Sequence, residues 1–269
     1  MLFPIQNGVL TLKGDTMHYV RFGHGPKTLI MLPGLGDGLT TVKGTALPMA
    51  LMYRAYAADY TVYMFSRRNH LPPAYTTREM ADDLRLAMDA LCIKKADFLG
   101  VSMGGMIAQH FAADFPQRVG KLVLTVTCAQ PNPILCTSID EWVSLAARGD
   151  HAALMQSNLR RMYSQAYCRK NSWMIPLIGR LTKPKSYERF FIQANACKTH
   201  DASARLSRIS APTLVIGGEQ DLALGAQASL EIAAAIPGAS LHMYAQWGHA
   251  LYEEAKDFHQ VVLRFLRNA

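Results

Sequence analysis

The stretch that decides the fold is Ala96-Asp97-Phe98-Leu99-Gly100-Val101-Ser102-Met103-Gly104-Gly105. Its first four residues predict a short apolar strand, and residues 106–115 have the spacing of a helix. The pattern Gly-x-Ser-x-Gly between them is typical of a nucleophile elbow, a tight strand-to-helix reversal that holds its serine in strained backbone geometry. We therefore expect the hydroxyl of Ser102 to stand at the end of a buried strand, with the amino terminus of a helix behind it.

Short apolar strands alternate with helical segments on both sides of this turn. Period-two alternation over residues 8–22 predicts an antiparallel hairpin. Six further strands are predicted at residues 28–32, 60–65, 96–99, 122–126, 213–216 and 240–244, and helical segments such as 80–91 and 227–235 lie between several of them. Buried parallel strands with crossover helices have this pattern, so the fold class is α/β.

The chain resembles the α/β-hydrolase superfamily over nearly its whole length. The motifs that carry the likeness are the serine turn, Leu32-Pro33-Gly34-Leu35-Gly36, Gly217-Gly218-Glu219-Gln220-Asp221 and Trp247-Gly248-His249. Within the superfamily the chain is similar to the small cytosolic serine esterases and lactonases. The resemblance implies a mostly parallel eight-stranded sheet flanked by helices, with a helical cap inserted over the active site.

Residues 131–208 fit the position of such a cap. They contain helical stretches at 139–147 and 152–163 and no convincing strand. We expect residues 131–208 to form the cap and residues 1–130 and 209–269 to form the hydrolase core, although an ordinary set of packing helices is the alternative. The segment holds 12 Lys and Arg against 5 Asp and Glu, a net charge of +7. That charge suits an anionic substrate, a transient contact with anionic lipid, or a merely solubilising surface.

The composition limits the classes of protein to which this chain can belong. Half of the 269 residues are apolar, 18% are charged, and the first seven residues lack the features of a signal peptide. No apolar run reaches the length of a membrane span. The five cysteines are Cys92, Cys128, Cys136, Cys168 and Cys197. Their odd number and wide spacing favour reduced thiols in a cytoplasmic protein and argue against a zinc site. We expect no stable membrane insertion and no nucleic-acid binding, and the oligomeric state stays open.

A serine hydroxyl needs a base, and histidine has a suitable pKa. The best of nine candidates is His249, in the loop after the last predicted strand. Asp221 follows the strand at 213–216 and would orient that histidine, whereas the nearby Glu219 reads more simply as a solvated turn residue. Ser102, Asp221 and His249 also stand in the chain order that this fold uses.

The oxyanion formed during acyl transfer needs backbone donors that are already in place. One is expected to be the N–H of Met103, directly after the nucleophile. By resemblance, the second is the N–H of Leu35. Relatives often carry His-Gly where this chain has Pro33-Gly34, but the donor is a backbone group, so the exchange need not abolish the site.

The loop after the strand at 60–65 also departs from the family pattern. Relatives often read Asp-x-Arg-Gly-x-Gly, whereas this chain has Ser66-Arg67-Arg68-Asn69-His70-Leu71. By resemblance Arg67 is structural. Arg68 and His70 either reach the substrate or are solvated loop residues.

The predicted function is hydrolysis of a carboxylic ester, thioester or lactone through an acyl-serine intermediate, on a small-molecule substrate and with neither cofactor nor metal. An acyltransferase, an aminopeptidase or a C–C bond hydrolase with the same triad is the alternative within enzymes. A ligand-binding receptor that has lost turnover is the alternative outside them, and the presence of all three triad residues argues against it.

Overall fold

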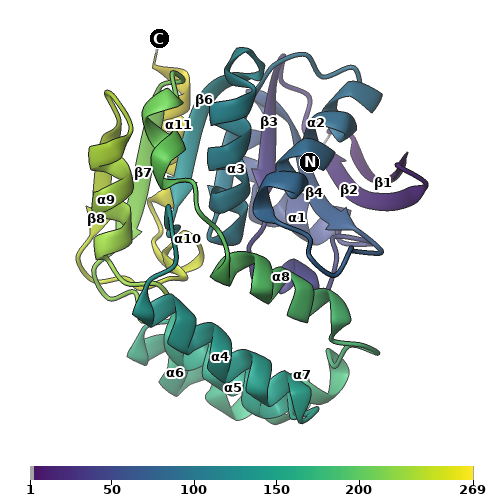
Figure 1. Ribbon diagram of the computed structural model, residues 1–269, viewed down its shortest axis with the longest axis vertical. Helices are drawn as coiled ribbons and strands as arrows, with labels where there is room; N and C mark the ends of the chain where they lie inside the picture. Colours follow the sequence, from purple (N-terminus) through teal and green to yellow (C-terminus); the bar gives the residue numbers. More distant parts are fainter. Residues whose placement is uncertain (1–2, 269) are drawn as a thin grey trace.

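The computed structural model describes residues 3–268 and contains one eight-stranded sheet (Figure 1). The strands are β1 (Ile5–Leu12), β2 (Asp15–Phe22), β3 (Lys27–Leu32), β4 (Tyr60–Arg68), β5 (Ala96–Val101), β6 (Val119–Thr125), β7 (Thr213–Gly218) and β8 (Ser240–Tyr244). Their order is β1-β2-β4-β3-β5-β6-β7-β8. The β1–β2 and β2–β4 pairs are antiparallel and the remaining pairs are parallel. The predicted hairpin and mostly parallel sheet are confirmed.

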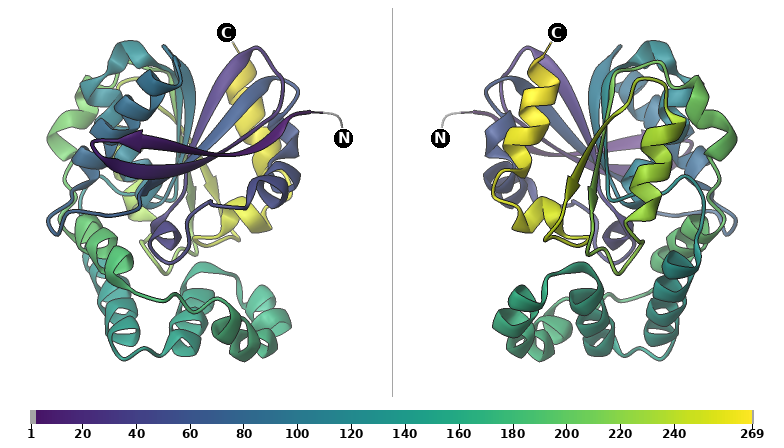
Figure 2. Two further views of the ribbon diagram at one scale, coloured as in Figure 1. Left: turned by 90° about the vertical axis from the view of Figure 1, so that its right-hand side faces the viewer. Right: turned by 90° about the vertical axis from the view of Figure 1, so that its left-hand side faces the viewer.

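Helices cover both faces of the sheet and bury its side chains in two apolar clusters. One cluster is closed by α2 (Thr77–Ala90), α3 (Met103–Asp114) and α9 (Gln227–Ala235), the other by α1 (Ala46–Met52) and α11 (Phe258–Arg267). Figure 2 shows α3 and α11 on opposite sides of the strands. Because both faces are covered, all six residues of β7 are buried, which is why the parallel strands have continuous apolar sequences.

Five α-helices fill the interval between β6 and β7. They are α4 (Pro133–Ala147), α5 (His151–Met162), α6 (Gln165–Asn171), α7 (Ile175–Leu181) and α8 (Glu188–Lys198). Figures 1 and 2 show them as a separate layer at the end of the molecule opposite the carboxyl terminus. The 3₁₀-helix η5 (Ser203–Arg208) packs against α3 and α9 of the core. We call α4–α8 the cap as a name for these helices, and the division of the chain at residues 131 and 208 stays a prediction.

Within residues 3–268, no helix combines the length and the apolar character that crossing a bilayer requires.

Two buried histidines lie where the helical layer rejoins the core. His110 of α3 and His200, just after α8, meet edge to face with ring centroids 5.0 Å apart. Thr77 Oγ1 lies 2.8 Å from His200 Nδ1. Burial lowers the pKa of His110 to about 4 and that of His200 to about 3. Both rings are therefore neutral in the folded protein at neutral pH.

We expect the unfolding free energy to fall as the pH drops from about 6.5 toward 4. The unfolded chain binds protons on these histidines with an ordinary pKa near 6.5, whereas the folded chain resists them, so acid favours unfolding. The loss amounts to several kcal/mol at most for the coupled pair, since one pKa unit corresponds to about 1.4 kcal/mol. Urea titrations at several pH values measure it. A double variant, His110→Gln/His200→Gln, should have a flatter profile, and an unchanged slope would contradict the assignment.

Candidate active site

Ser102 sits at the reversal between β5 and α3 with a backbone φ of 54° and ψ of −121°. Its amide donates to the carbonyl of Thr125 on β6 at 2.9 Å, which fixes the turn to the sheet. A Cβ at Gly100 would come within 2.7 Å of Gly104 O, and one at Gly104 within 1.9 Å of Leu32 O. The two glycines of the motif are therefore required by close backbone contact, and the serine occupies the left-handed region that strains a side chain.

His249 and Asp221 form a buried pair. His249 Nδ1 lies 2.8 Å from Asp221 Oδ2, and the two residues are 4% and 6% exposed. The other carboxylate oxygen of Asp221 accepts the amides of Ala223 and Leu224, each at 2.9 Å. The carboxylate is thus fixed from both sides, and the ring nitrogen left for other chemistry is Nε2.

The histidine loop is supported from two directions. On the core side, the Gln220 amide donates to Trp247 O at 3.2 Å, which joins the aspartate turn to this loop. On the cap side, the Ala250 amide donates to Met162 O at 2.8 Å. Ser164 Oγ, just beyond α5, donates to Glu254 Oε2 at 2.6 Å in the short helix α10 (Leu251–Glu254). The end of α5 therefore helps to set where His249 lies.

Ser102 and His249 line the same cavity, which has a volume of about 560 Å³. Within residues 3–268 no hydrogen bond joins Ser102 Oγ to the histidine ring. Such bonds are often long before substrate binds. The cap contributes a mostly apolar wall to this cavity, made of Leu135, Trp142, Met155, Met162, Ile178 and Phe190. The structure thus brings the predicted nucleophile and base to one largely apolar cavity.

The two predicted oxyanion donors are the amide of Leu35, in the loop of residues 33–38 that we call the oxyanion loop, and the amide of Met103, directly after Ser102. Neither the Leu35 amide nor the Met103 amide has an acceptor among residues 3–268. Leu35 opens the 3₁₀-helix η1 (Leu35–Gly38), and Met103 opens α3, so each amide is one of the unsatisfied donors at a helix start. A Cβ at Gly34 would lie 3.3 Å from Ser102 Cβ, which shows how closely this loop approaches the serine.

Arg67 supports the loop of residues 33–38 through a hydrogen bond to its first residue. Its side chain is buried and its Nη2 donates to Pro33 O at 2.6 Å. Burial lowers the pKa of Arg67 from its ordinary value. The contact agrees with the structural part that the resemblance implied for Arg67.

Asp37 is a site residue that the sequence analysis did not single out. Its Oδ2 accepts the Arg67 amide at 3.1 Å, Arg189 Nη2 at 2.9 Å and Gln193 Nε2 at 3.3 Å. Its Oδ1 is buried without a partner among residues 3–268, and the residue lines the cavity. Asp37 therefore joins the oxyanion loop to α8 of the cap. An acidic residue between two glycines of that loop was the feature that could have revealed it.

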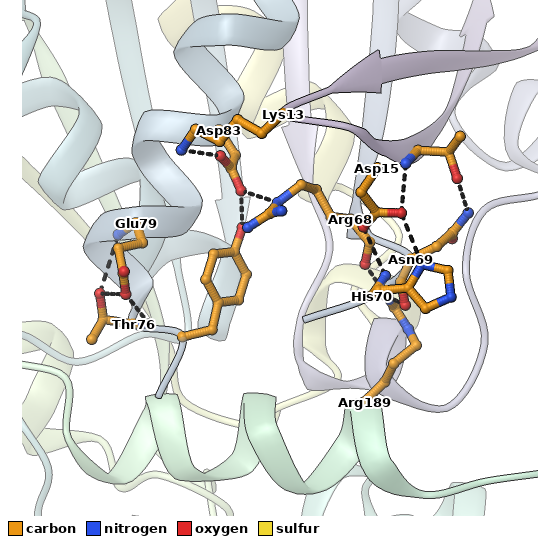
Figure 3. A network of polar contacts seen from close by, with 11 residues as sticks. Lys13, Asp15, Arg68, Asn69, His70, Thr76, Glu79, Asp83 and Arg189 are labelled. Atoms are coloured by element: carbon orange, nitrogen blue, oxygen red, sulfur yellow. Dashed lines mark hydrogen bonds and ion pairs between the residues drawn. The ribbon is translucent and has the colours of Figure 1, made fainter. Parts of the chain in front are cut away.

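Arg68 and His70 take part in a network of polar contacts with acidic side chains (Figure 3). Arg68 Nε contacts Asp83 Oδ2 at 2.6 Å. His70 bonds to Asp15 at 2.9 Å, with its side chain 91% exposed. Neither residue lines the cavity, so the interpretation in which they reach the substrate is not supported.

The positive charge of residues 131–208 does not form the cavity wall. No Lys or Arg of the described chain lines the cavity, whereas Asp37 and Glu253 do. Arg161 instead pairs with Glu141 at 2.6 Å, and Arg189 pairs with Asp37 at 2.9 Å. The cavity therefore offers no fixed positive side chain to a buried anion.

Comparison with known proteins places this site in a family. A hydrolase from Cupriavidus pinatubonensis named for 2-hydroxy-6-oxononadienedioate and 2-hydroxy-6-oxononatrienedioate is 32% identical over 95% of this chain and 93% of its own length. An α/β hydrolase from a Medee basin deep-sea metagenome superposes with a TM-score of 0.86 at 22% identity, covering 97% of this chain and 98% of that one. The enol-lactonase of Burkholderia xenovorans superposes with a TM-score of 0.81 at 24% identity, covering 97% of this chain and 100% of that one.

The profile described as the alpha/beta hydrolase family matches residues 29–261, from the strand that precedes the oxyanion loop to the final helix. The family match and the full-length relative are consistent with the observed strand order and with the strand-to-helix turn at Ser102. The chain is a hydrolase and belongs to the alpha/beta hydrolase family.

Proposed function

We propose that this protein is a serine hydrolase that cleaves an uncharged, largely apolar ester or lactone through an acyl-Ser102 intermediate. The observation that carries the proposal is the buried Asp221–His249 pair, whose histidine lines the same apolar cavity as Ser102 and the loop of Leu35. A cavity of about 560 Å³ suits a small-molecule substrate.

Each group has a defined part in the proposed reaction. Ser102 Oγ attacks the carbonyl carbon while His249 Nε2 takes its proton, and Asp221 stabilises the imidazolium through Nδ1. The amides of Leu35 and Met103 bind the oxyanion. The imidazolium then protonates the leaving oxygen. Water, deprotonated by His249, releases the acid and restores Ser102.

The lining of the cavity supports an uncharged substrate. Six methionines are among the lining residues, namely Met31, Met49, Met52, Met64, Met155 and Met162. Thioether side chains adapt to irregular apolar shapes, so a range of acyl groups can be accommodated. No Lys or Arg among the described lining residues would pair with a buried carboxylate, which makes its burial costly.

A matched pair of esters tests this substrate class. We expect kcat/KM for p-nitrophenyl hexanoate to exceed that for the p-nitrophenyl monoester of adipic acid by at least about tenfold, because the second buries an uncompensated charge. Initial rates with Ser102→Ala protein as the blank measure the ratio. Equal rates, or a preference for the anion, would overturn the uncharged substrate class.

Cleavage of a C–C bond is the second candidate, and the likeness to the Cupriavidus hydrolase favours it. The acyl-serine step is unchanged, but the leaving group is a carbanion that must be stabilised and protonated at carbon. That relative's name describes a dicarboxylate, for which this cavity supplies no Lys or Arg among the described residues. Loss of the conjugated absorbance of a 2-hydroxy-6-oxo-dienoate, faster than ester hydrolysis, would establish this reading instead.

A further inference from the structure

The segment that follows α6, made of the 3₁₀-helix η4 (Ser172–Met174) and α7, exposes large apolar side chains in a regular row. Trp173, Leu177 and Leu181 are 75%, 61% and 76% exposed and follow one another at intervals of four residues. Leu177 and Leu181 lie on one face of α7, because residues four apart share a helix face, and Trp173 precedes them in η4. Water-facing rows of this size are uncommon on protein surfaces and mark contact with another surface.

Cations stand close to this row in the sequence. Arg169, Lys170 and Arg180 are exposed and form no ion pair within residues 3–268. Residues 163–187 contain no Asp or Glu, whereas Lys183 and Lys185 add two more positive charges. We call Arg169, Lys170, Trp173, Leu177, Arg180 and Leu181 the α6–α7 surface. Figure 1 shows these two helices at the end of the molecule opposite the carboxyl terminus.

We propose that the α6–α7 surface docks the protein reversibly on an anionic lipid bilayer. Trp and Leu side chains enter the boundary between headgroups and acyl chains, while neighbouring Lys and Arg contact lipid phosphates and carboxylates. Long basic side chains can lie along apolar surface and keep their charge at the headgroups. The combination of both side-chain types on one exposed face fits a bilayer surface.

A second copy of this chain fits the surface less well. A twofold contact would place the same patch on both subunits, so at least five positive charges from a stretch without Asp or Glu would face their equivalents. Like charges opposed across an interface disfavour association. Charge complementarity therefore points to an anionic occupant.

The surface lies next to the active-site cavity. Ile178 of α7 and Thr182, directly after α7, are each one position beyond a leucine of the row and line the cavity. One thin element thus separates the proposed bilayer contact from the substrate space. The docking proposal goes beyond the acyl-serine chemistry, and its readout is binding rather than turnover.

Sedimentation with vesicles tests the contribution of the basic side chains to bilayer binding. We expect wild-type protein to bind vesicles of phosphatidylcholine mixed with phosphatidylserine and not vesicles of phosphatidylcholine alone. The triple variant Arg169→Gln/Lys170→Gln/Arg180→Gln should bind about a hundredfold more weakly, at about fivefold per cation. The matched control is Lys27→Gln/Lys94→Gln/Lys95→Gln, which removes the same charge from exposed lysines at the other end of the sheet. Its binding should change little.

A second pair of variants tests the contribution of the apolar side chains to bilayer binding. Leu177→Ser/Leu181→Ser should weaken binding at least about tenfold, since each leucine loses buried apolar area. Leu230→Ser/Leu241→Ser, at exposed positions of α9 and β8, should not. The proposal is overturned if the wild-type protein does not bind anionic vesicles or if the two triple variants lose binding equally. It is also overturned if Leu177→Ser/Leu181→Ser binds as well as the wild-type protein. Self-association in analytical ultracentrifugation that is lost in the leucine variant would identify a second copy as the occupant.

Discussion

Replacing Ser102 with alanine should remove essentially all turnover, with a loss on the order of 10⁴ to 10⁶ in kcat. The reason is that the acyl group then has no oxygen to which it can be transferred, while cavity and fold stay as they are. Steady-state kinetics on the best ester, with circular dichroism as the check of folding, measure the loss. His249→Ala should lose a similar amount.

The double variant Ser102→Ala/His249→Ala should be little worse than either single change, because nucleophile and base act as one unit. A fluorophosphonate probe should label the wild-type protein at Ser102 and leave the alanine variant unlabelled. Retention of more than about a tenth of the activity by Ser102→Ala would exclude the acyl-serine mechanism.

Replacing Asp221 with asparagine should lower kcat by roughly 10⁴. The two amides that hold Oδ1 keep the side chain in place, so the change is electronic rather than steric. An amide group presented to His249 Nδ1 favours the wrong tautomer and leaves Nε2 protonated, so the ring cannot take the serine proton.

Glu219 provides the matched control for this carboxylate. It lies two residues before Asp221, is exposed, and forms no part of the cavity lining. Glu219→Gln should therefore leave kcat unchanged within about twofold, since surface substitutions have small effects. If Glu219→Gln instead reproduced the loss expected of Asp221→Asn, the orienting carboxylate would have been assigned to the wrong residue.

The core could be predicted from sequence because burial and periodicity act locally along each element. The helix expected at residues 227–235 has those bounds as α9. The helix expected from residue 106 begins at Met103, because the strained Ser102 itself starts the helix and apolar spacing says nothing about such a turn. The predicted site residues also stand at strand ends, where parallel topology brings distant segments together.

The cap was less predictable, since its short helices are fixed by contacts with other segments. The sequence indicated bounds only for the helical stretches at 139–147 and 152–163, whereas five α-helices are present between β6 and β7. Arg189 appeared only as part of a basic segment, yet it is an ion-pair partner of Asp37 beside the oxyanion loop. Counting charged residues gives the sign of a segment's net charge but not the direction in which each side chain points.

The cap has two bonded supports in the catalytic core, Arg189 on Asp37 and the end of α5 on the loop of His249. Protein engineers who exchange substrate range by grafting a cap from a relative will therefore change more than the walls of the cavity. Such a graft also replaces the groups that steady the oxyanion loop and the base. A chimera of this scaffold needs its junctions chosen so that Asp37 and Glu254 keep partners of the same chemistry.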